Sequence, residues 1–293
     1  MKNKIAVISI VWLLLLVLTL PAFGTHHGKA KPDKKGILLV AFGSSIPEAQ
    51  IAFEYIEKKT TETFPEIPVR WAFTSHMIRK KMADEGKNLD SVTQALANMA
   101  EEGFTHVAVQ SLHTIPGEEF HELNQAVRAF GHIPEGFKKI SIGLPLLGDQ
   151  KDMERVASAI MTTLPQQRKP EDAVLLMGHG TSHASNASYA ALMWQLQLQD
   201  PNIFLGVVEG FPEISDILPI LKARNIQKVW LMPFMSVAGD HARNDMAGPE
   251  EDSWKSILNH AGMNCEVILR GTGEYNEFVE IWVDHIRDSL KKF

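Results

Sequence analysis

Eight short apolar runs, arranged as two sets of four, are the feature that most constrains the fold of this chain. The first set covers 37–42, 69–73, 107–112 and 140–144, and the second covers 174–177, 205–208, 229–233 and 267–269. Each run is rich in Val, Ile and Leu, is followed closely by Gly or small polar residues, and alternates with segments of helical period. This alternation is typical of βα units. The sequence therefore predicts an α/β fold of two similar Rossmann-like lobes with parallel sheets.

The two halves also resemble each other locally. Residues 37–45 align with 174–182, and residues 114–119 align with 236–241. At the ends of the runs the matched pairs are Phe42 with His179, Thr74 with Glu209 and Glu119 with His241. We interpret this as an ancient duplication with an N-terminal lobe at 36–165 and a C-terminal lobe at 166–293. Chance similarity is the alternative, because strand-Gly turns recur in all such folds.

The first residues differ from the rest of the chain. Lys2 and Lys4 precede an apolar run over 5–20, and small residues follow at 21–24, which is the pattern of a secretory signal peptide. We predict a signal peptide at 1–24, a polar tether at 25–35, a periplasmic location and no stable membrane insertion after cleavage. An uncleaved anchor is the alternative, since a spanning helix needs roughly 20 apolar residues.

A cut after Gly24 would leave Thr25, His26 and His27 at the new amino terminus. The amine, two backbone amides and the third-position imidazole can form the square-planar nitrogen set preferred by Cu(II) or Ni(II). A merely soluble tether is the alternative.

Composition and missing motifs exclude several classes of protein. The single cysteine, Cys265, excludes an intrachain disulfide and a cysteine-ligated iron–sulfur cluster within one chain. A net charge of -6 argues against nucleic acid as the main partner. The chain has no dinucleotide-binding glycine motif, Walker loop, nucleophile elbow or H-E-x-x-H helix, which disfavours a nucleotide enzyme or a serine hydrolase.

Three candidate metal ligands, His179, Glu209 and His241, follow strand-like runs of the second half at spacings of about one βα unit. Carboxyl ends of parallel strands meet at one edge of a sheet, so these side chains are expected to lie together. Two imidazoles and a carboxylate suit Co, Fe, Ni or Zn and leave coordination positions open. Taken singly, a histidine at a strand end is more often a hydrogen-bonded structural residue.

Several segments resemble the anaerobic sirohydrochlorin cobaltochelatases of the class II chelatase superfamily. They are 38–43, 72–75, 110–113, 177–180 and 237–246. The resemblance implies the class II chelatase fold, with His179 and His241 as metal-site histidines and Glu209 as their acidic partner. It also implies insertion of Co²⁺ into sirohydrochlorin. Close relatives insert Fe²⁺, so the resemblance leaves Fe²⁺ as an alternative metal.

Two features depart from that family pattern. The leader is one, because typical members are cytoplasmic, and export leaves room for a role in metal or haem transport. The other is His121, which has no ligand counterpart in the typical pattern. It is interpreted either as a solvated helix histidine or as an accessory ligand for a haem or a metal.

The expected mechanism assigns His179 as general base as well as ligand, and Glu209 as the group that balances charge. Basic side chains that could bind the substrate's carboxylates are Arg79, Lys80, Lys81 and Arg243. Hydroxyl groups that either cap helices or bind carboxylates are Ser44, Ser45, Thr181 and Ser182.

Two other functions remain open at this point. An exported metal or tetrapyrrole carrier would bind stoichiometrically without turnover, and a zinc hydrolase would act without any macrocycle. Met193, Trp194 and Leu196 form either a stripe for a homo-oligomer interface or ordinary core packing.

Overall fold

A computed structural model describes residues 32–134 and 136–293 of the chain. Its strands are β1 Lys35–Ala41, β2 Val69–Phe73, β3 His106–Ser111, β4 Lys139–Gly143, β5 Ala173–Gly180, β6 Ile203–Glu209, β7 Lys228–Pro233 and β8 Asn264–Val267. Its α-helices are α1 Gln50–Thr63, α2 His76–Asp84, α3 Val92–Glu101, α4 Glu118–Phe130, α5 Gln150–Thr163, α6 Ala187–Gln197, α7 Ile214–Ala223, α8 Trp254–His260 and α9 Asn276–Leu290. Short helical turns are η1 Pro47–Ala49, η2 Ala184–Asn186, η3 Ala242–Met246 and η4 Thr272–Glu274.

The predicted signal peptide and residues 25–31 of the predicted tether lie outside the described residues. Within the part of the chain that the structure describes, no helix has the length and apolar character needed to cross a membrane.

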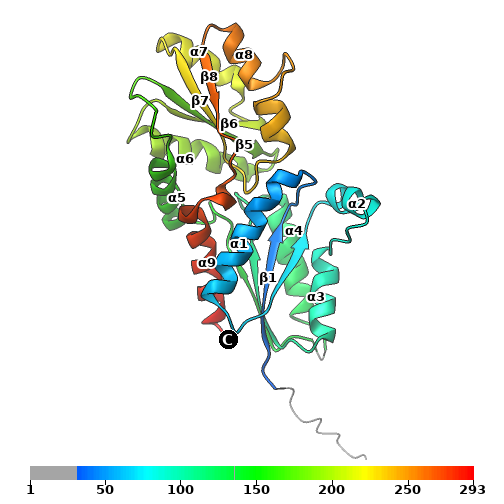
Figure 1. Ribbon diagram of the computed structural model, residues 1–293. Helices are drawn as coiled ribbons and strands as arrows, with labels where there is room; N and C mark the ends of the chain where they lie inside the picture. The colour runs from blue at the N-terminus through cyan, green and yellow to red at the C-terminus, as the bar shows by residue number, and fades with distance from the viewer. Residues whose placement is uncertain (1–31, 135) are drawn as a thin grey trace, which may run out of the picture. The chain divides into compact units, whose positions relative to one another are not determined.

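The strands form two four-stranded parallel sheets with equivalent orders, β2-β1-β3-β4 and β6-β5-β7-β8. Each sheet belongs to one lobe, and the two lobes are seen one above the other in Figure 1. The equal strand orders confirm the predicted fold class of two similar Rossmann-like lobes.

Alternate residues of the central strands face different cores, as the two-residue period of a strand requires. In β1, Ile37 and Leu39 belong to a large shared core, whereas Leu38 packs with α3 and α4 on the opposite face. In β5, Leu176 faces the shared core and Leu175 faces a core that includes α7 and α8. Both faces of each central strand are therefore buried, which explains their nearly continuous apolar sequences.

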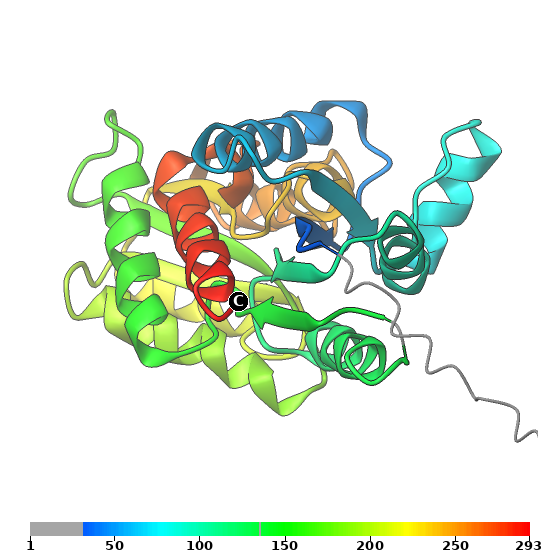
Figure 2. The ribbon, with the colours of Figure 1, turned by 90° about the horizontal axis from the view of Figure 1, so that it is seen from below.

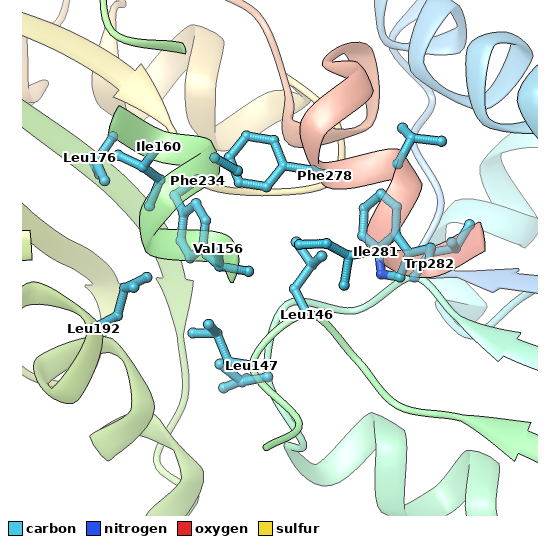
Figure 3. Packing of buried hydrophobic residues seen from close by; sticks show 14 of the residues in the cluster. Leu146, Leu147, Val156, Ile160, Leu176, Leu192, Phe234, Phe278, Ile281 and Trp282 are labelled. Carbon is cyan, nitrogen blue, oxygen red and sulfur yellow. The ribbon is translucent and has the colours of Figure 1, made fainter. Parts of the chain in front are cut away.

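The shared core joins the two lobes. Figure 3 shows Leu146 and Leu147, which follow β4, close to Val156 of α5 and Ile281 of α9. Leu176 of β5 belongs to the same cluster of buried side chains. The cluster contains buried residues of both lobes, so hydrophobic burial holds the lobes together.

The helices next to this core cross between the lobes. Although α9 is the last helix of the chain, it packs against β3 and β4 of the first sheet (Figure 1). Figure 2 shows α9 and α1 on one side of that sheet and α3 and α4 on the other. Conversely, α5 packs beside α6 of the second lobe. The expected lobe ranges, 36–165 and 166–293, thus separate the two sheets but do not assign α5 and α9 to the lobes that they cover.

A buried polar cluster ties these two crossing helices together. The side chain of His285 on α9 places Nε2 2.7 Å from Asp152 Oδ2 of α5 and Nδ1 2.9 Å from the Leu144 carbonyl oxygen. Both side chains are largely buried, with 11% of His285 and 5% of Asp152 exposed. Arg155 extends the cluster to Asp284 at 2.6 Å.

We predict that His285→Ala lowers the free energy of unfolding by about 3–5 kcal/mol, because it leaves the buried Asp152 carboxylate without its main partner. Urea unfolding of the variant and the parent chain measures this difference. The matched control is Lys291→Ala, which removes an exposed ion pair with Asp288 on the same helix end. Equal effects of the two substitutions would contradict the prediction.

Candidate metal and substrate site

Two histidines meet at the carboxyl end of the second sheet. His179 lies near the end of β5, and His241 follows β7, which is the neighbour of β5. Their ring centroids are 4.7 Å apart and their planes are inclined by 86°. The structure therefore brings together two of the three predicted metal ligands, from adjacent strands as expected.

The hydrogen bonds of the two rings leave the same nitrogen open on each. His179 Nδ1 lies 3.0 Å from the Gly180 carbonyl oxygen, which accepts only if Nδ1 carries the hydrogen. His241 Nδ1 lies 2.5 Å from Asp245 Oδ2, which fixes the hydrogen on Nδ1 in the same way. Each Nε2 then holds an unshared electron pair, which is what a metal ligand requires.

The bond to Asp245 depends on an unusual turn. Residues 242–246 form the π-helical turn η3, which begins immediately after His241. Single π turns inside helices are frequent at functional sites. Here the turn sets Asp245 against His241, and a carboxylate behind a histidine fixes its orientation and raises its basicity as a ligand. Sequence reasoning missed Asp245, although the four-residue spacing of an acid after a candidate histidine was a signal for it.

The third predicted ligand, Glu209, ends the neighbouring strand β6 and pairs with Gly180 in the sheet register. Its side chain is exposed, and it forms no hydrogen bond or ion pair with any residue that the structure describes. Across 32–134 and 136–293, no three His, Cys, Asp or Glu side chains are grouped closely enough to hold a metal ion. The role of Glu209 as a ligand stays a prediction.

The glycines beside His179 are explained by contacts within the chain. A side chain at Gly180, whose φ is +83°, would place Cβ 1.8 Å from the carbonyl oxygen of Glu209. A side chain at Gly178 would place Cβ 2.7 Å from the ring of Tyr189. These positions are glycine because the strand and its neighbours lie too close for Cβ, and this close packing fixes the backbone that presents His179.

The first lobe faces the histidines with an aromatic ring and a polar cluster. Phe42, just after β1, is 37% exposed, and its ring centroid lies 6.3 Å from that of His179. Loops from both lobes meet nearby in an equivalent way: a Cβ at Gly239 would contact Ser44 Oγ, and a Cβ at Gly117 would contact Ser185 Oγ. The two lobes thus close against each other at their strand ends.

The polar cluster is centred on Glu119, the second residue of α4. Thr74 donates from Oγ1 to Glu119 Oε2 at 2.8 Å, and His113 Nε2 lies 3.0 Å from the same oxygen. Among the described residues, Oε1 has no partner. Sequence reasoning matched Glu119 to His241 but gave it no role, and it missed His113, which directly follows the third apolar run.

Opposing influences set the charge of Glu119. Burial raises the pKa of this carboxyl group, but hydrogen bonds from His113 and Thr74, together with the charges of His113 and His179, lower it by more. The net effect is a pKa below the usual value, so Glu119 is ionised at neutral pH. One of the charges that lower this pKa, that of His179, belongs to the second lobe.

The predicted substrate-binding residues have local roles in the structure. Arg79 donates from Nη1 to the carbonyl oxygens of Phe73 at 2.6 Å and Thr74 at 2.7 Å, and Arg243 donates from Nε to Ala238 O at 3.1 Å. These bonds leave other guanidinium nitrogens open to a ligand.

The hydroxyl groups are engaged in turns in the same way. Ser44 Oγ accepts from Ile46 N, and Thr181 Oγ1 accepts from His183 N. Ser45 is partly exposed. Substrate binding by Arg79, Arg243, Ser44 and Ser45 stays a prediction.

His121 contacts a histidine ring of the second lobe. It is exposed on α4, and its ring centroid is 5.1 Å from that of His183, in the loop after β5. Of the predicted interface stripe, Leu196 is fully buried whereas Trp194 is 67% exposed, so the three residues do not share one surface.

Comparison with known proteins places this chain in a family. Residues 35–291 match the family model described as cobalt chelatase (CbiK). A curated relative named sirohydrochlorin cobaltochelatase CbiKC, from Nitratidesulfovibrio vulgaris, is 46% identical over 253 residues, which cover 86% of this chain and 89% of the relative. A sirohydrochlorin cobaltochelatase from Salmonella typhimurium is 35% identical over 259 residues, covering 88% of this chain and 97% of the relative.

Solved structures of chelatases share the fold. SirB from Bacillus subtilis with Fe³⁺ superposes with a TM-score of 0.57 at 16% identity, covering 87% of this chain and 95% of SirB. CbiX, described as the terminal enzyme of sirohaem biosynthesis in denitrifying bacteria, gives a TM-score of 0.52 at 18% identity, covering 86% of this chain and 98% of CbiX. These likenesses confirm the predicted class II chelatase architecture.

We predict that Asp245→Asn weakens Co²⁺ binding by about 10–100-fold, because it removes the charged acceptor that orients His241. Calorimetric titration with Co²⁺ measures the dissociation constant. The matched control is Asp240→Asn, which changes a neighbouring exposed carboxylate that bonds only to Asn244. Unchanged Co²⁺ affinity in Asp245→Asn would show that this contact does not support a metal ligand.

Proposed function

The chain belongs to the cobalt chelatase (CbiK) family and is a metal chelatase, and we propose that it inserts Co²⁺ into sirohydrochlorin between its two lobes. The reaction exchanges two pyrrole N–H protons for one divalent ion. The observation that carries the proposal for the site is the pair of imidazoles, His179 and His241, whose ring centroids are 4.7 Å apart and whose Nε2 atoms are both left open by the hydrogen bonds of Nδ1. Two protein nitrogens hold an ion while leaving positions free for the macrocycle.

Glu209 completes the proposed ligand set. Its exposed carboxylate ends β6, the strand paired with the end of β5, and it has no competing partner among the described residues. A side-chain rotation brings such a group to an ion held by the neighbouring strand, and its negative charge balances the charge of Co²⁺. Free rotation also lets the carboxylate release the ion when the macrocycle takes it.

The roles of ligand and base fall to different groups in this proposal. His179 has one unshared electron pair, on Nε2, because its Nδ1 donates to Gly180 O. While that pair binds the metal, it cannot accept a proton. We therefore assign proton acceptance to Glu119, which is ionised, carries one oxygen without a partner among the described residues, and interacts electrostatically with His179.

The exposed ring of Phe42 provides an apolar surface opposite the metal ligands. It occupies the position that His179 holds in the second lobe, so the first lobe offers packing where the second offers coordination. In the proposed complex, the flat macrocycle lies between these surfaces with its nitrogens toward the ion. Binding of its carboxylates by Arg79, Arg243, Ser44 and Ser45 is part of the same proposal.

The proposal also includes Fe²⁺ as an alternative metal and His121 as an accessory ligand for a haem or a metal. The imidazole and carboxylate set suits Fe²⁺ as well as Co²⁺, since both are borderline ions. The exposure of His121 on α4 supports an accessory haem or metal site there. Association of chains into a homo-oligomer is a further proposal, supported by exposed apolar side chains such as Trp194.

We expect the purified chain to metallate sirohydrochlorin with Co²⁺ over many turnovers, as followed by the visible absorption spectrum. Glu119→Gln should lower kcat by about 10²–10⁴-fold, because an amide cannot accept the pyrrole proton. Co²⁺ binding should persist in this variant, since both histidines remain. Stoichiometric binding without turnover would favour the carrier function instead, and hydrolytic activity without a macrocycle would favour a zinc hydrolase.

Export is a separate proposal. The basic and apolar pattern of residues 1–24 supports a signal peptide, and the family match begins only at residue 35. We expect the mature chain to begin at Thr25 and to be periplasmic. Intact-mass measurement on chain recovered from fractionated cells tests both points, with Leu15→Arg, which interrupts the apolar run, as the variant that should stay unprocessed. A mature chain that retains residues 1–24 would exclude cleavage.

A further inference from the structure

The polar cluster behind Glu119 contains an imidazole that the proposed reaction does not use. His113 follows β3, and only 11% of its side chain is exposed. Its ring spans the distance between the buried Ser111 hydroxyl and the Glu119 carboxylate.

We propose that His113 is a positioning residue for metallation: with Ser111 and Thr74 it holds one oxygen of the Glu119 carboxylate so that the other oxygen stays open to the pyrrole N–H groups. This inference rests on the proposed function, in which Glu119 is the proton acceptor. It assigns His113 no direct contact with the metal or the macrocycle.

The hydrogen bonds in the cluster form a chain from Ser111 through His113 to the Glu119 carboxylate. Ser111 Oγ accepts from the backbone N–H of His113 at 3.4 Å and lies 2.9 Å from His113 Nδ1. The Glu119 carboxylate can only accept, so Nε2 carries the hydrogen that it donates to Oε2. With the ring hydrogen on Nε2, Nδ1 accepts from the Ser111 hydroxyl. Thr74 donates to the same oxygen of Glu119 at 2.8 Å.

The direction of the hydrogen bond from His113 to Glu119 gives His113 a positioning role and no role in proton transfer. Nε2 already holds a hydrogen, so His113 cannot take a proton from Glu119 through that atom. Two donors occupy Oε2, whereas Oε1 has no partner among the described residues. A proton from the macrocycle therefore goes to Oε1 and leaves from there to solvent, and the bonds on Oε2 keep the carboxylate ionised and fixed between transfers.

The charged groups around Glu119 come from several elements. His113 after β3 and His179 on β5 act on Glu119 directly. Glu118 and His121 lie on the same helix as Glu119, and Arg79 on α2 bonds to the carbonyl oxygen of Thr74. Burial alone would raise the pKa of Glu119, and the His113 hydrogen bond is the largest influence that opposes it. Removing that bond should therefore raise the pKa, and the base should lose its ionised form at a higher pH.

The experiment compares His113→Leu with His113→Gln, whose amide N–H reproduces the donor at the Nε2 position. In steady-state assays with Co²⁺ and sirohydrochlorin, His113→Leu should lower kcat by about 10–100-fold, as for other groups that hold an active residue in place. The acidic limb of its pH profile should move to higher pH, while KM and Co²⁺ affinity stay at parent values. His113→Gln should recover most of kcat and return the acidic limb toward the parent position.

The matched control is His106→Leu, which changes a buried histidine at the opposite end of the same strand. His106→Leu should leave the pH profile unchanged. A parent-like pH profile and kcat in His113→Leu would overturn the inference, as would His113→Gln behaving like His113→Leu. If His113→Leu fails to fold, Ser111→Ala decides, because loss of the donor to Nδ1 should shift the acidic limb in the same direction.

Failure of the inference and failure of the proposed function give different results. If the parent chain does not turn over Co²⁺ and sirohydrochlorin, the proposed function is wrong. If the parent chain turns over and Glu119→Gln is inactive, but the His113 variants match the parent, only the role of His113 is wrong.

Discussion

The continuous apolar core between the two sheets is the interaction on which the rest of this molecule depends. Each sheet presents alternate residues of its central strand to this core, and α5 and α9 fill the space between the lobes. Because interiors are packed as densely as organic crystals, the lobes are held in one mutual position rather than joined by a flexible linker. That position sets Phe42 of one lobe opposite His179 of the other.

The two similar lobes carry different chemical groups at equivalent strand ends. Equivalent strand ends carry imidazoles in the second lobe and a phenyl ring and a carboxylate in the first. Coordination of a cation and acceptance of a proton compete for the same electron pairs, so one residue cannot serve both needs at once. In the proposed reaction, groups on opposite lobes would keep the ligand and the base apart.

The sequence predicts the sheets and the meeting of His179 and His241, because period and strand-end position are local signals that translate directly into a parallel sheet. It shifts the last strand by three residues: the apolar run 267–269 overlaps β8, Asn264–Val267, only at Val267. The edge position and alternating exposure of β8 explain why its sequence lacks an apolar signal. The supporting contacts of Asp245 and His113 depend on a π turn and on a loop conformation, which no apolar pattern encodes. The packing of α9 on the first sheet depends on tertiary contacts alone.

The packing of α9 on the first lobe and of α5 on the second also affects how the chain folds during synthesis. Residues 276–290 emerge last from the ribosome, yet they cover β3 and β4, which emerge early. Until then α1 covers part of the apolar inner face of the first sheet, but the contacts of α9 are missing, so this lobe reaches its final packing only when synthesis is complete. In a polypeptide that completes its core only with its last helix, the order of packing differs from the order of synthesis.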